Sequence, residues 1–175
     1  MKKHVTTVLM VIALIFFDQL TKYFALNNLR INGKISLIQG VFSLLYVENR
    51  GAAFGIMQNM RLFFIILTII ICLFIGYVLY KLPHQKRFVF LRLVCIFLLA
   101  GALGNFIDRI VHGFVVDFLY FELIDFPVFN IADCYVTLST IALFFLLVFY
   151  HTDEELAILF PAKKGNKETK EEERL

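Results

Sequence analysis

Four apolar stretches, each about as long as a bilayer is thick, dominate this 175-residue sequence. They cover residues 5–29, 62–82, 88–111 and 132–150. A helix needs about 20 apolar residues to cross the hydrocarbon core, and only helices or closed barrels satisfy their backbone there. Hydrophobic residues make up 60% of the chain, whereas an average soluble domain has about half. The sequence therefore predicts an all-α integral membrane protein with four transmembrane helices.

The first apolar stretch follows two lysines, a pattern that also begins signal peptides. A small-x-small cleavage site is missing and the stretch continues to Leu29, so we interpret it as an uncleaved transmembrane helix. We expect residues 1–160 to form one membrane domain. Residues 161–175 are polar and charged, which predicts a disordered cytoplasmic tail.

The basic residues indicate an orientation. Most fall on one side of a four-helix topology: Lys2, Lys3, the group from Lys81 to Arg92, Lys163, Lys164 and Lys167. Loops rich in Lys and Arg stay in the cytoplasm, so we expect both termini there and the loops 27–61 and 114–129 outside. The net charge of +3 comes from these flanks. Because the basic residues form no stripe with interleaved aromatics, no nucleic-acid partner is expected.

The two outer loops differ in character. In the first, the β-prone runs 35–38 and 41–47 surround Gln39-Gly40, which predicts a small hairpin or cradle. Two glycines and two alanines between Gly51 and Gly55 would let another chain approach closely, although spacing alone favours an ordinary turn into an amphipathic segment. The second loop, 114–129, is rich in Phe and Tyr, which suits a membrane interface.

Polar side chains gather at the outer membrane face. They are Asn105, Asp108, Arg109, Asp117, Asn130 and Asp133. Since ionisable residues are unfavourable there, they suggest function. Asp117 and Asp133 flank one short loop, and two carboxylates brought together cannot both ionise easily. The pair therefore predicts an acid and a base, as in aspartic proteases. By itself Asp133 also reads as a first-turn acid behind an Asn130 N-cap.

Other polar residues suggest support for this pair. Asp18 and Lys22 are spaced for an ion pair within one helix. We expect Asp108 and Arg109 to form an ion pair at a helix end, and Asn105 to hydrogen-bond across helices. Cys134 has no histidine evidently placed to activate it, so a thiol nucleophile is disfavoured. Without a CxxC or HExxH motif, no metal site is expected.

Two other classes remain open. A small transporter or channel subunit would also hold ionisable residues in the membrane, but as a relay it needs them along the whole pathway. In this sequence the cytoplasmic halves of the helices hold few. A structural assembly factor would tolerate replacement of Asp117 by Asn.

Five blocks, in this order, are similar to those of the lipoprotein signal peptidases, the type II signal peptidases. The blocks are Asp18–Lys22, Asn49–Gly55, Gly104–Arg109, Val115–Phe118 and Phe129–Asp133. Each is weak alone, but five on one four-helix topology are specific. The resemblance extends to about Tyr150.

The resemblance implies an aspartic endopeptidase of the bacterial plasma (inner) membrane. Such enzymes remove the signal peptide from diacylglyceryl-modified prolipoproteins, cutting before the lipidated cysteine. The family's catalytic pair corresponds to Asp117 and Asp133. Its supporting residues correspond to Asp18, Lys22, Asn49, Gly51, Asn105, Asp108, Arg109, Asn130 and Ala132. It also implies a β-cradle and a short helix outside the membrane, no metal or organic cofactor, contact with membrane lipids, and inhibition by globomycin-like antibiotics.

Overall fold

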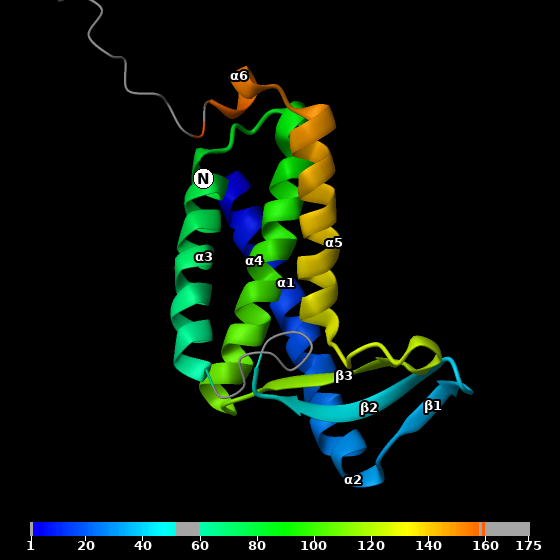
Figure 1. Ribbon diagram of the computed structural model, residues 1–175. Helices are drawn as coiled ribbons and strands as arrows, with labels where there is room; N and C mark the ends of the chain where they lie inside the picture. Colours follow the sequence, from blue (N-terminus) through cyan, green and yellow to red (C-terminus); the bar gives the residue numbers. More distant parts are fainter. Residues whose placement is uncertain (1, 52–59, 158, 160–175) are drawn as a thin grey trace, which may run out of the picture.

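Four long helices form the body of the protein in a computed structural model that describes residues 2–51, 60–157 and 159 (Figure 1). They are α1 (Lys2–Phe24), α3 (Arg61–Lys81), α4 (Val89–Val111) and α5 (Ile131–Phe145). Each is long and apolar enough to cross a membrane once flanking turns are included. The predicted integral membrane fold is confirmed. Three predicted features lie outside the described residues: most of the Gly51–Gly55 segment, the short helix expected there and the polar tail.

Two of the helices continue as wider turns. α1 runs into a π-helical turn at Ala25–Leu29 and then α2 (Arg30–Asn32), and α5 runs into a π-helical turn at Leu146–Tyr150. The larger apolar core lies toward the end of the bundle that carries α6 (Asp153–Leu156), where Leu79 and Leu91 are buried; a smaller core packs Leu29 against Val116 and Phe118 of the third strand. Many apolar side chains outside that core face outward, as expected for helices surrounded by lipid.

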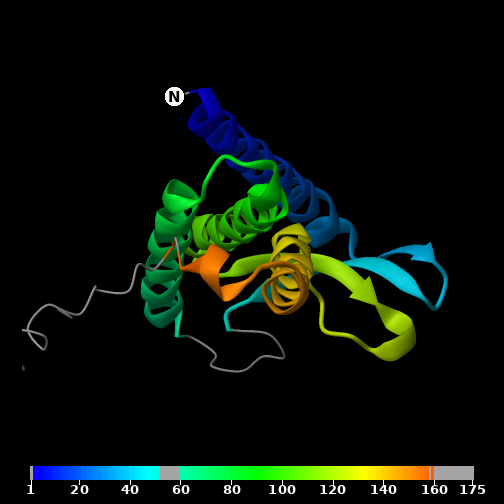
Figure 2. The ribbon, with the colours of Figure 1, turned by 90° about the horizontal axis from the view of Figure 1, so that it is seen from above.

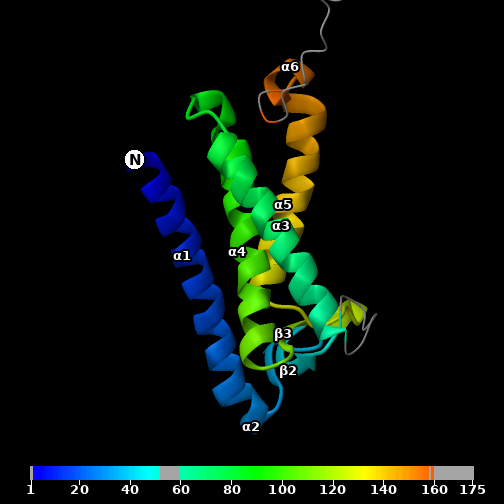
Figure 3. The same cartoon turned by 90° about the vertical axis from the view of Figure 1, so that its left-hand side faces the viewer.

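α4 is the central helix and contacts α1, α3 and α5 (Figures 2 and 3). Two glycines make the close contacts possible. A Cβ added at Gly101 would lie 2.6 Å from the Ala132 carbonyl oxygen of α5, and one at Gly104 would lie 2.5 Å from Asp18 Oδ2 of α1. Small residues commonly let membrane helices approach in this way. Three helices therefore meet where the polar residues lie.

A three-stranded antiparallel sheet covers the end of the bundle opposite α6 (Figure 1). Its order is β1 (Ile35–Ile38), β2 (Phe42–Asn49) and β3 (Val115–Phe121). The hairpin predicted in the first loop is confirmed, with its second strand shifted from 41–47. The part of the aromatic loop that becomes β3 was not predicted as a strand. Its run of β-branched and aromatic residues suits a strand buried on both faces, which lacks the usual alternation.

The register brings first-loop residues over the second loop. Asn49 lies opposite Val115, and Val47 lies opposite Asp117, with a register shift between Leu44 and Val47. The shift is a bulge-like irregularity of the kind that re-aims side chains near active sites. β3 therefore carries Asp117 beneath the end of β2, next to the ends of α4 and α5.

A network of ion pairs joins α6 to the turn before α4 at the end of the bundle opposite the sheet. Arg87, in the turn before α4, donates to Glu155 of α6 with Nε to Oε1 at 2.9 Å. The same carboxylate contacts His151 Nδ1 at 3.1 Å. Thr152 caps α6 through a capping box with Glu155. The segment after α5 is thereby tied back to the beginning of α4.

Candidate active site

Asp117 and Asp133 are brought together by Asn130. Asp133 lies in the first turn of α5, and Asn130 caps that helix by accepting a hydrogen bond from the Asp133 backbone N–H at 3.0 Å. The Asn130 backbone N–H returns a bond to Asp133 Oδ2 at 3.1 Å. Its side-chain Nδ2 donates to Asp117 Oδ1 at 2.6 Å. The helix-cap interpretation of Asn130 is therefore correct, and the same residue also touches the second carboxylate.

Three asparagines direct their amide donors at the two carboxylates. Asn49 Nδ2 donates to Asp117 Oδ2 at 2.9 Å, and Asn105 Nδ2 donates to Asp133 Oδ1 at 2.7 Å. Each amide oxygen accepts from a group that can only donate: the Gly51 N–H, the Lys22 ammonium and, for Asn130, the Asp133 N–H. The oxygens are thus assigned, so the amide nitrogens must face the carboxylates.

Asp117 lies in an environment that favours its protonated form. The residue is 1% exposed. Burial, followed by the nearby charge of Asp133, raises the pKa of Asp117 from 3.8 to about 7. The hydrogen bonds from Asn49 and Asn130 and the charge of Lys22 act in the opposite direction and are outweighed. Two coupled carboxyl groups, one of which keeps its proton near neutral pH, have the composition needed for general acid–base chemistry.

A buried charge cluster lies behind the pair. Lys22 Nζ contacts Asp18 Oδ2 at 3.0 Å and Asp108 Oδ2 at 3.1 Å, and donates its third bond to Asn105 Oδ1 at 2.8 Å. The predicted pair of Asp18 and Lys22 is confirmed. The predicted pair of Asp108 and Arg109 is wrong, because neighbouring residues on a helix point to different sides.

Arg109 serves the first loop instead. Its guanidinium donates to the Gly51 carbonyl oxygen and to the Asn105 carbonyl oxygen, each at 3.3 Å. It also lies 4.9 Å from the centroid of the Phe64 ring on α3. Arg109 therefore ties α4 to both the first loop and α3. It also carries a positive charge close enough to be influenced by both members of the pair.

All eleven residues expected at the site lie in one connected cluster. They are Asp18, Lys22, Asn49, Gly51, Asn105, Asp108, Arg109, Asp117, Asn130, Ala132 and Asp133. Ala132 takes part through its backbone N–H, which donates to Asp18 Oδ1 at 2.9 Å. Gln19 and Val116 also contact the cluster, although their sequence context predicts no role for them. Their contacts depend on how the elements meet, and no local pattern announces them.

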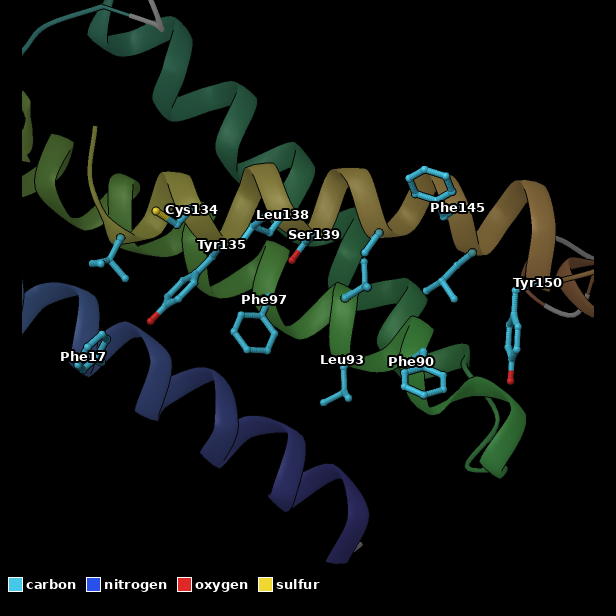
Figure 4. Close-up of a pocket in the computed structure, with 14 residues that line it drawn as sticks. Phe17, Phe90, Leu93, Phe97, Cys134, Tyr135, Leu138, Ser139, Phe145 and Tyr150 are labelled. Carbon is cyan, nitrogen blue, oxygen red and sulfur yellow. The ribbon is translucent and has the colours of Figure 1, made fainter. Parts of the chain in front are cut away.

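Cys134 faces away from this cluster. It lines an apolar groove of about 790 Å³ between α1, α4 and α5 (Figure 4). On a helix the residues that face this groove, such as Cys134, Tyr135 and Leu138, leave Asp133 on another side. The groove is therefore separate from the paired carboxylates. Within residues 2–51, 60–157 and 159, no cluster of His, Cys, Asp and Glu is arranged to hold a metal ion.

Fold and cluster together define a multi-pass membrane protein with two coupled carboxylates at the sheet end of its helices. The sequence profile described as Signal peptidase (SPase) II matches residues 10–149. The lipoprotein signal peptidase of Clostridioides difficile is 46% identical over 145 residues, covering 83% of this chain and 96% of that one. The enzyme of the same name from Streptococcus thermophilus is 43% identical over 138 residues, covering 78% and 88%.

Solved structures of bacterial membrane enzymes share the fold of this chain. A bacterial membrane enzyme superposes with a TM-score of 0.73 at 36% identity, covering 82% of this chain and 87% of that one. A second gives 0.70 at 35% identity, covering 83% and 94%. The chain belongs to the signal peptidase II family and is a membrane peptidase.

Proposed function

We propose that Asp117 and Asp133 cleave the signal peptide from diacylglyceryl-modified prolipoproteins, cutting before the lipidated cysteine. The observation that carries the proposal is the Asn130 bridge, which holds the buried carboxyl of Asp117 and the half-buried carboxyl of Asp133 in one hydrogen-bonded unit. Family membership supplies the reaction class. We assign the resting proton to Asp117, whose pKa is raised to about 7 by burial and by the charge of Asp133.

The two residues take complementary roles. Asp133, as carboxylate, accepts a proton from water while the water oxygen attacks the scissile carbonyl carbon. Asp117 gives its proton to the carbonyl oxygen, so that a neutral gem-diol forms. The C–N bond then breaks as Asp133 passes its proton to the leaving amine of the cysteine. Asp117 recovers a proton from one diol hydroxyl as the new carboxyl group forms, which returns the pair to its starting state.

The position of the polar residues favours a peptidase over an ion relay. The buried charged groups that the structure describes in the helices are Asp18, Lys22 and Asp108, and they lie at the sheet end, because Asp108 accepts from the Val116 N–H of β3 and Lys22 contacts both carboxylates. The interior toward α6 is filled by apolar side chains such as Ile75, Leu79 and Leu91. A relay needs ionisable groups along its whole path.

Substrate binding follows from the same surroundings. A peptide near the membrane boundary needs partners for its backbone groups, because unpaired ones cost several kcal/mol in lipid. Asn49 donates to Asp117 and accepts from the Gly51 N–H, so these two residues offer a place for an extended strand near the pair. The acyl chains of the substrate cysteine contribute about 0.8 kcal/mol per buried CH₂. Cyclic peptides of the globomycin type should inhibit by occupying the pair.

We place the protein in the bacterial plasma membrane with both termini in the cytoplasm. The sheet lies at the opposite end of the bundle from the N-terminus and α6 (Figures 1 and 3). Basic residues share the α6 end: α3 ends at Lys81, and the next turn holds Lys86 and Arg87, of which Arg87 donates to Glu155 of α6. Reporter fusions after Lys86 should therefore be cytoplasmic and fusions after Gly33 extracytoplasmic. The reverse pattern would put the pair on the wrong side for a signal peptidase.

The test is cleavage of a synthetic lipobox peptide by purified protein in detergent. Wild type should release the signal fragment from the diacylglyceryl-modified peptide and process the unlipidated peptide very poorly. Asp117→Asn and Asp133→Asn should each abolish cleavage and still melt cooperatively. Near-normal turnover by either variant would remove the two-aspartate mechanism. Equal rates on the two peptides would show that the enzyme does not read the lipid.

A further inference from the structure

Asp117 and Asp133 share a feature of the backbone: in each case the N–H of the preceding residue donates to the side chain of another aspartate. Asp18 Oδ1 accepts from the N–H of Ala132, the residue before Asp133, at 2.9 Å. Asp108 Oδ2 accepts from the N–H of Val116, the residue before Asp117, at 3.0 Å. Asp18 is 0% exposed and Asp108 is 1% exposed. The beginning of α5 and the beginning of β3 are therefore anchored to these two buried carboxylates.

The two anchors are joined to one another on two sides. Lys22 contacts Oδ2 of both, at 3.0 Å and 3.1 Å. Gln19 Nε2 donates to Asp108 Oδ1 at 2.9 Å and lies 3.2 Å from Asp18 Oδ2. It also lies 3.2 Å from the Gly104 carbonyl oxygen of α4. Since two carboxylates share one ammonium, the Gln19 amide is the second donor that holds them together.

We infer that Gln19 is a positioning residue for the reaction: its side-chain amide cross-links Asp18 and Asp108 and so sets the spacing between Asp117 and Asp133. The inference rests on the proposed function of that pair. Gln19 itself touches neither carboxyl of the pair in any described contact. It acts through the two anchored N–H groups. Reactions of this kind are sensitive to such shifts, because a misplacement of about 1 Å can lower the rate about 100-fold.

Spacing also controls how the pair titrates. The charged groups around Asp117 are Asp133 on α5, Lys22 on α1 and Arg109 on α4, whereas its β2 neighbour Asn49 is neutral. Repulsion between two charges falls as their separation grows. If the anchors move apart, Asp133 acts less on Asp117, and the alkaline limb of the pH profile moves to lower pH. A residue that only stabilised the fold would leave this limb in place.

Three substitutions separate the donor from the shape of the side chain. Gln19→Met keeps the length and removes both N–H donors. Gln19→Glu keeps the shape and turns a donor into an acceptor that repels both anchors. Gln19→Arg keeps N–H donors, and Gln19 borders a cleft of about 480 Å³ that has room for the longer side chain. Asn28→Met is the matched control. Asn28 lies in the same membrane-spanning segment, but its amide donates locally, to the Phe24 carbonyl oxygen at 3.0 Å.

The measurement is kcat, KM and their pH dependence with the lipidated peptide. For Gln19→Met we expect kcat to fall about tenfold or more with KM changed less than about twofold, and the alkaline limb to shift to lower pH. Gln19→Glu should be worse, Gln19→Arg should recover most of kcat and the wild-type limb, and Asn28→Met should match wild type. Wild-type kcat and an unshifted limb in Gln19→Met would overturn the inference.

The outcomes distinguish this inference from the proposed function. If wild type does not cleave, or Asp117→Asn still does, the proposed function fails first. If wild type cleaves and Asp117→Asn does not, the Gln19 series reports on positioning alone. If Gln19→Met does not accumulate in the membrane, the Gln19→Arg variant tests the inference instead. A Gln19→Arg protein that melts normally but has a kcat and an alkaline limb unlike those of wild type would contradict the cross-link.

Discussion

The pH dependence of cleavage tests the assignment of the resting proton most directly. Burial and the charge of Asp133 raise the pKa of Asp117 to about 7. With that value about nine-tenths of the enzyme carries the proton on Asp117 at pH 6, half at pH 7 and about one-tenth at pH 8. Since the protonated form is the active one, activity is retained below the pKa and lost above it. We therefore expect kcat/KM to fall about tenfold between pH 6 and pH 8.

The assay uses a lipidated lipobox peptide without titratable side chains, so that the limb belongs to the enzyme. Unfolding must be excluded, because a raised pKa also weakens the fold as pH rises. The contribution of protonated Asp117 is full below its unfolded pKa of 3.8 and lost as pH passes about 7, a shift worth about 4 kcal/mol. Melting curves at each pH provide this control. A folded enzyme whose kcat/KM stays flat from pH 6 to pH 8.5 would refute a resting proton on Asp117.

Three further predictions concern the helix contact behind the pair, the protease class and the α6 end of the bundle. Gly104→Ala should lower activity and destabilise the protein by about 1–3 kcal/mol, because the added Cβ would lie 2.5 Å from Asp18 Oδ2. Gly76→Ala is the control and should not destabilise, because a Cβ there meets nothing within 4 Å. Thermal melts of the two variants test the difference. EDTA should not inhibit, and Cys134→Ser should keep most activity; inhibition by either route in the peptide assay would indicate another protease class. Glu155→Gln should lower the melting temperature and leave kcat unchanged. Hydrogen bonds from Arg87 hold the pKa of Glu155 at about 2, so the difference should persist above about pH 4.5 and shrink as pH falls toward 2.

The membrane helices could be predicted because lipid leaves few alternatives. Apolar runs of spanning length must become helices, and their ends fell within a few residues of the observed ones. The strand β3 was missed because it is buried on both faces and its aromatic residues suggested an interface loop. Five of its seven positions, all but Asp117 and Leu119, are β-branched or aromatic, and they are the signal that favours a strand.

The site was predictable where partners are close in sequence and less so where they are not. Asp18 and Lys22 are one helical turn apart, so their pairing follows from spacing. Asp108 was assigned to its neighbour Arg109, but its partner is Lys22 on another helix. The bridge made by Gln19 depends on the approach of α1 to Gly104, which no local pattern encodes.

The Asp18–Lys22 pair also has a consequence for the time during which the chain is synthesised. Gln19 and Asp108 are 89 residues apart, so at about 5–20 residues per second α1 waits roughly 4–18 s before Asp108 is made. A lone carboxylate in lipid would be unfavourable during that interval. Because Lys22 Nζ lies 3.0 Å from Asp18 Oδ2 within the same helix, the spanning segment His4–Leu29 can remain in the bilayer with its two charges paired. When α4 arrives, its Asp108 joins an ammonium group that is already in place.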